Sequence, residues 1–128
     1  MRRTLSVTVL LLTAIVFAPA RAADAGPFIV FFTSWSALID QPAHDTVVAA
    51  AAAAKLSNAP VRVTGFASTV GSAEANKLLS QLRAQVVADE LVADGVDAKR
   101  ITLTGVGPTS FMADPLEARR VRIEVGGN

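Results

Sequence analysis

The chain has 128 residues, of which 12 are Lys or Arg and 11 are Asp or Glu, and its formal net charge is +1. This length suits one domain, and such a balanced charge gives no electrostatic case for a nucleic-acid partner. The absence of cysteine excludes disulfides, thiolate metal sites and thiol nucleophiles.

The first 22 residues have the pattern of a secretory signal peptide. Arg2 and Arg3 form a basic start, residues 5–17 are apolar apart from Ser and Thr, and residues 20–22 read Ala-Arg-Ala, a small-residue cleavage site. The apolar run is shorter than the roughly 20 residues of a membrane span, so we expect cleavage and no transmembrane span afterwards. Retention as an uncleaved anchor is the alternative. Cleavage would leave 9 basic and 11 acidic residues, a mildly acidic domain.

A domain is predicted over residues 28–126, after a short exit segment at 23–27. It opens with Phe-Ile-Val-Phe-Phe at 28–32, a continuous apolar run typical of a strand buried on both faces. The polar loop that follows contains Trp35, the only tryptophan. A tryptophan in such a loop is more often a lid over the core than a platform for a ligand.

Two helices are predicted. The first covers residues 43–56, with Pro42 in its first turn, and its many alanines allow it to lie close to a sheet. The second begins near Ser72, a good N-cap residue, and ends near Ala93, where an Asp-Gly pair follows.

Three further strands complete the pattern. They are predicted at 61–66, at 101–104 and, with strict alternation of apolar and charged residues, at 119–125. A turn is expected at 105–108 and an irregular segment at 109–117. The order β-α-β-α-β-β corresponds to two βαβ units followed by a return strand.

Arg83 is predicted on the apolar face of the second helix, because Leu79 and Val87 lie four residues to either side of it. Asn76 and Ser80 share that side, so a guanidinium, an amide and a hydroxyl should lie beside the loop that precedes the helix. One interpretation is an arginine that snorkels or pairs with a structural carboxylate. The other is a forked donor that awaits a ligand carboxylate.

The sequence resembles the OmpA-like domain, the peptidoglycan-associating module of outer membrane protein A, peptidoglycan-associated lipoproteins and flagellar stator proteins. The matching stretches are FIVFF, VRVTGFASTVGS, ANKLLSQLRAQVVADELVADGV, RITLTGVGP and ARRVRIEV. The resemblance implies an α+β fold with a mixed four-stranded sheet and two main helices, the last strand running antiparallel to the rest. It also implies non-covalent association with peptidoglycan.

In that family an Asp in a Gly-His-Thr-Asp loop meets the ammonium of diaminopimelate, and the Arg of Ser-x-x-Arg-Ala binds its carboxylate. Arg83 matches the arginine, but Ser68 stands in place of the Asp and Phe66 in place of the His. Loss of one charge-assisted hydrogen bond is expected to weaken or alter ligand recognition, by roughly tenfold to a hundredfold. The ligand-binding residues that the resemblance implies are Arg83, Ser68, Thr69, Asn76, Ser80 and Arg120.

The expected function is therefore that of a non-catalytic periplasmic module, associated with the outer membrane or the cell wall, that binds the diaminopimelate stem peptide of peptidoglycan. The alternative is a structural or protein-interaction domain that no longer binds peptidoglycan and whose partners are envelope proteins. Catalysis is disfavoured, because His44 is the only histidine and is expected on an exposed helix face. No metal site and no cofactor are expected.

Overall fold

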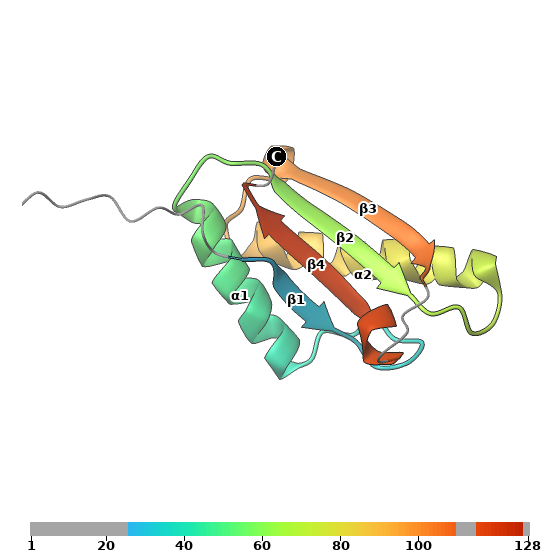
Figure 1. Ribbon diagram of the computed structural model, residues 1–128. Helices are drawn as coiled ribbons and strands as arrows, with labels where there is room; N and C mark the ends of the chain where they lie inside the picture. Colours follow the sequence, from blue (N-terminus) through green and yellow to red (C-terminus); the bar gives the residue numbers. More distant parts are fainter. Residues whose placement is uncertain (1–25, 110–114, 127–128) are drawn as a thin grey trace, which may run out of the picture.

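The computed structural model describes residues 26–109 and 115–126, and the predicted signal peptide lies outside them. One four-stranded sheet has the order β1-β4-β2-β3 (Figure 1). β4 runs antiparallel to β1 and to β2, whereas β2 and β3 are parallel. The predicted α+β fold with a mixed sheet and a return strand is confirmed. The strands are β1 (Phe28–Phe31), β2 (Val61–Ala67), β3 (Ile101–Pro108) and β4 (Arg120–Val125).

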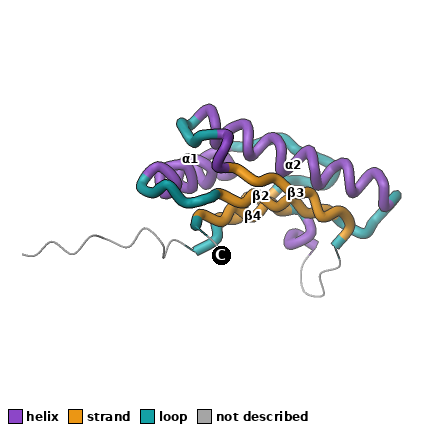
Figure 2. Tube along the Cα trace, turned by 90° about the horizontal axis from the view of Figure 1, so that it is seen from above, coloured by secondary structure: helices purple, strands orange, loops and turns teal. Residues whose placement is uncertain are grey.

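Two long helices, α1 (Gln41–Lys55) and α2 (Ala73–Ala93), cover one face of the sheet, as the view from above shows (Figure 2). The side chain of Asp40 caps α1, and Ser72 caps α2 as predicted, its hydroxyl accepting the N–H of Ala75 at 3.2 Å. Two short 3-10 helices, η2 (Ala98–Arg100) and η3 (Pro115–Ala118), precede β3 and β4. No helix in the described ranges is long and apolar enough to cross a membrane.

The core lies between the helices and the sheet. Its largest apolar side chains are buried and come from both layers. Small alanines on the buried face of α1 complete the core. The main members are Val30, Phe32, Val47, Val61, Val63, Val87, Leu91, Val121 and Ile123.

α2 lies directly on the backbone of two strands, at Gly65 of β2 and Gly105 of β3. A Cβ added at Gly65 would be 2.0 Å from the carbonyl oxygen of Ser80, and one at Gly105 would be 2.5 Å from the backbone nitrogen of Gln81. Only glycine permits this approach. The two contacts fix where the middle of α2, and therefore Arg83, sits above the sheet.

Two predictions about strands were wrong. β1 is not buried on both faces, because the helices cover one face of the sheet only (Figure 2) and Phe31, on the other face, is 43% exposed. It is also an edge strand, paired only with β4. The turn expected at 105–108 is part of β3, because Gly105 still pairs with Gly65 and Pro108 with Ala67, across a local shift in register. Local sequence indicates a turn there, but the neighbouring parallel strand keeps the segment extended.

Candidate functional site

Arg83 is the largest fully buried side chain of the described residues, with 1% of its surface exposed. Its Nε donates to the carbonyl oxygen of Ser36 at 2.8 Å, Nη1 to that of Phe66 at 3.0 Å, and Nη2 to that of Thr33 at 3.1 Å. One side chain on α2 thus joins the loop after β1 to the end of β2.

The charge of Arg83 is not neutralised by a carboxylate. Within residues 26–109 and 115–126, its guanidinium forms no ion pair, and its other close contact is the ring of Phe32, whose centroid is 5.4 Å from Cζ. Burial, helped by the positive charge of Arg119, lowers the pKa of Arg83 to about 10. The interpretation as a snorkelling or carboxylate-paired arginine therefore fails for the described residues.

The guanidinium also keeps donor capacity. It carries five N–H groups, and the three carbonyls engage one on each nitrogen. One N–H on each terminal nitrogen is left over. Two donors on one guanidinium can bind the two oxygens of a carboxylate.

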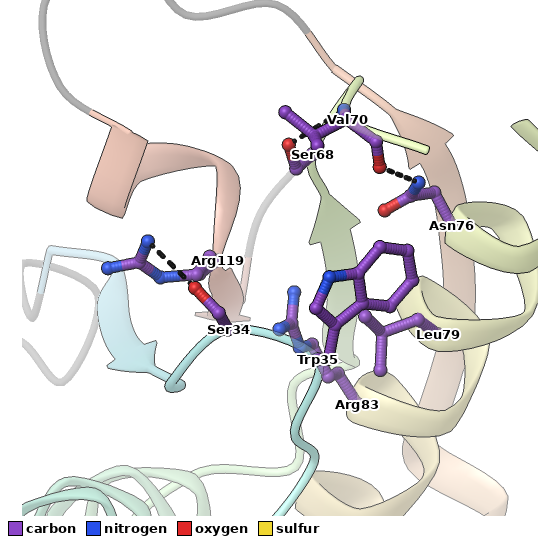
Figure 3. Close-up of a pocket in the computed structure, with 8 residues that line it drawn as sticks. All are labelled: Ser34, Trp35, Ser68, Val70, Asn76, Leu79, Arg83 and Arg119. Atoms are coloured by element: carbon purple, nitrogen blue, oxygen red, sulfur yellow. Dashed lines mark hydrogen bonds between the residues drawn. The ribbon is translucent and has the colours of Figure 1, made fainter. Parts of the chain in front are cut away.

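Arg83 lines a cavity of about 180 Å³. Figure 3 shows the guanidinium between the loop after β1 and the loop after β2, and Trp35 and Leu79 line the same cavity. The lining residues are Ser34, Trp35, Ser68, Val70, Asn76, Leu79, Arg83 and Arg119.

The loop after β2 is held in place by Asn76, which is 1% exposed. Its amide nitrogen donates to the carbonyl oxygens of Val70 at 2.8 Å and Ser72 at 3.0 Å. Within the loop, the hydroxyl oxygen of Ser68 accepts the N–H of Val70 at 3.0 Å (Figure 3). Among the described residues, the hydroxyl proton of Ser68 has no acceptor at the pocket wall.

Of the six residues predicted for the site, Arg83, Ser68 and Asn76 line this pocket. Ser80 does not, because it is fully buried between α2 and β3. Its hydroxyl donates to the carbonyl of Lys77 at 2.7 Å and accepts the N–H of Gly107 at 2.9 Å. Its position serves the packing of the helix on the sheet.

Thr69 and Arg120 are also outside the pocket lining. Thr69 is exposed on the loop. The guanidinium of Arg120 lies 4.2 Å from the ring centroid of Phe66 and donates to the carbonyl of Glu117 at 2.8 Å. Since Arg120 alternates with the buried Val121 along β4, it points to the sheet face that the helices leave uncovered.

The neighbouring Arg119 is a pocket residue that sequence reasoning missed. Its Nε donates to the carbonyl of Phe32 at 3.2 Å and its Nη1 to the hydroxyl of Ser34 at 3.4 Å. The Arg-Arg pair before the last strand was visible in the sequence, but only the register of β4 decides which of the two faces the pocket.

Trp35 forms one wall of the pocket and is 58% exposed, so it is not a lid over the core. Its backbone has φ 55°, a left-handed conformation that is uncommon for a residue other than glycine. A Cβ at Gly71 would lie 3.1 Å from the indole. The sequence gives no signal for this backbone geometry.

The pocket is positively charged and suits an anionic group. Two arginines line it, and none of the described lining residues is acidic. In the described part of the chain, no group of three or more His, Cys, Asp or Glu could hold a metal ion. His44 is partly exposed on α1 and pairs with Glu90 of α2.

Comparison with known proteins agrees with this geometry. The model of the OmpA family matches residues 31–122. Outer membrane protein 40 of Porphyromonas gingivalis is 41% identical over 80 residues, which are 62% of this chain and 21% of that protein. The probable lipoprotein YiaD of Escherichia coli is 36% identical over 85 residues, which are 66% of this chain and 39% of that protein. The chain thus spans less than half the length of these curated relatives, whose names are consistent with a cell-envelope location.

Among solved structures, the cell wall anchor of the T6SS from Pseudomonas aeruginosa superposes with a TM-score of 0.61 at 32% identity. That match covers 76% of this chain and 75% of the other.

Proposed function

Since this chain belongs to the OmpA family, a family of non-catalytic peptidoglycan-binding modules, we propose that it associates with peptidoglycan in the periplasm. Arg83 binds the free carboxylate of the diaminopimelate residue in the stem peptide. The observation that carries this proposal is the buried guanidinium, which has no carboxylate partner among the described residues and keeps two N–H groups unused beside a cavity.

The other residues predicted for the site have different roles. Asn76 positions the loop after β2, because it bonds two of the loop's carbonyls. Ser68 contacts the ligand with an uncharged hydroxyl, so a ligand ammonium meets no carboxylate there and forms no ion pair. Ser80 acts indirectly, through the placement of α2, and Thr69 and Arg120 are assigned no direct contact.

A sacculus pull-down tests the proposal. Arg83→Lys keeps the positive charge but loses the forked geometry, so binding should fall about tenfold. Ser68→Asp should strengthen binding to free diaminopimelate groups. Arg100→Lys is the matched control, because Arg100 also bonds backbone carbonyls, those of Ala54 and Ala59, but lies outside the pocket.

Circular dichroism must show that each variant is folded, because Arg83 also supports the fold. If Arg83→Lys binds sacculi as well as the unchanged protein and Ser68→Asp gains nothing, the proposed site is wrong.

A structural or protein-interaction domain is the second candidate, favoured by an apolar pair on the outer face of α2. Leu78 is 60% exposed and Leu82, one turn later, is 52% exposed. Under this alternative the unchanged protein ignores sacculi but co-purifies with a periplasmic protein, and Leu82→Lys abolishes that co-purification.

A further inference from the structure

The charges around the pocket disfavour a ligand ammonium. Arg119 is near enough to Arg83 to contribute to the lowering of its pKa. An ammonium beside the bound carboxylate would bring a third positive charge to a pocket whose described lining holds no acid.

The hydroxyl of Ser68 offers the pocket a donor as well as one remaining acceptor lone pair. Its oxygen already accepts the N–H of Val70 at 3.0 Å, and its proton has no acceptor in the described ranges. An ammonium has three donors and no acceptor, so it cannot use that proton. An amide carbonyl can.

The apolar part of the pocket lining also disfavours an ammonium. Trp35, Val70 and Leu79 line the pocket beside these polar groups. A charged ammonium loses hydration against such a surface, whereas an uncharged acyl group gains contact with it.

We infer that this pocket prefers a diamino acid whose side-chain amine is acylated, as it is in a peptide cross-link, over one whose amine is free. The acyl carbonyl accepts the proton of Ser68, while the carboxylate on the same carbon binds Arg83. This inference rests on the proposed function, since it names the form of stem peptide that the same pocket selects.

Two synthetic tripeptides, L-Ala-γ-D-Glu-meso-diaminopimelate with its side-chain amine either free or acetylated, provide the test. Trp35 is the only tryptophan and lines the pocket, so its fluorescence reports binding to the full chain, and calorimetry gives an independent affinity. We expect the acetylated peptide to bind about tenfold more tightly.

Variants of Ser68 test how much this side chain contributes to the preference between the two peptides. Ser68→Ala removes the donor and should abolish most of the preference, whereas Ser68→Asp should reverse it. Thr102→Glu adds the same charge at an exposed position near the start of β3, and its preference should equal that of the unchanged protein.

The outcomes distinguish this inference from its premise. Equal or tighter binding of the free-amine peptide by the unchanged protein overturns the inference and leaves the proposed function standing. Failure of both peptides to bind refutes the proposed function, and the inference with it.

Discussion

Replacing Arg83 by methionine, which is similar in length but uncharged, should destabilise the fold even without a ligand. The change removes the three hydrogen bonds that the guanidinium donates to the carbonyls of Thr33, Ser36 and Phe66. Hydrogen bonds from a charged group contribute about 1.5–3 kcal/mol each, so the loss of three such bonds should lower the free energy of unfolding by about 5–9 kcal/mol. Burial of the charge has an opposing cost, because it lowers the pKa of Arg83 to about 10. Methionine carries no charge and avoids this cost, which offsets about 3 kcal/mol of the loss. The net loss should be about 2–6 kcal/mol.

Urea unfolding followed by circular dichroism measures this difference. Arg100→Met is the control, because its guanidinium also bonds two backbone carbonyls but is partly exposed, and it should cost less. If Arg83→Met is as stable as the unchanged protein, the three carbonyl bonds do not stabilise the fold, and the reasoning about this side chain is refuted.

Three other predictions concern stability and local dynamics without a ligand. Gly65→Ala should cost about 3 kcal/mol of stability, since a Cβ there meets the backbone of α2 at 2.0 Å. Gly26→Ala should be neutral in the same urea titration, because among the described residues a Cβ there meets no atom within 4 Å beyond its chain neighbours. Glu90 raises the pKa of His44 above its ordinary value of 6.5, so the pair stabilises the folded state below that pH and loses its effect as pH rises through the folded-state pKa. The stability difference between the unchanged protein and His44→Gln should therefore shrink on going from pH 6 to alkaline pH, and a pH-independent difference would contradict this linkage. Asn76→Ala should cost about 1–3 kcal/mol and speed amide exchange in the loop after β2; unchanged exchange there would show that the side chain does not hold the loop.

The inward position of Arg83 could be predicted because helical spacing is strict. Leu79 and Val87 fix the face of α2, and any residue four positions from each must share it. The edge position of β1 could not be predicted in this way. An apolar run such as FIVFF indicates a strand but not its neighbours. Phe31 is exposed because it lies opposite Arg120, on the sheet face that the helices leave uncovered.

The pocket was predictable only in part, for a similar reason. Ser68 and Asn76 belong to one continuous stretch with Arg83, so their proximity follows from local structure. Trp35 and Arg119 reach the pocket through the pairing of β1 with β4, which brings together segments more than eighty residues apart. The left-handed backbone of Trp35 depends on that tertiary setting as well.

Under the proposed function, the bond between Arg83 and the carbonyl of Phe66 has a mechanical consequence. β2 is an inner strand, hydrogen-bonded to β3 on one side and to β4 on the other. Tension from a ligand held by Arg83 would enter α2 through that side chain, and through the bond to Phe66 it would also reach the end of β2. Ladder bonds lie across the strand direction, so a pull along β2 loads them in shear, all at once, and does not peel them apart one after another.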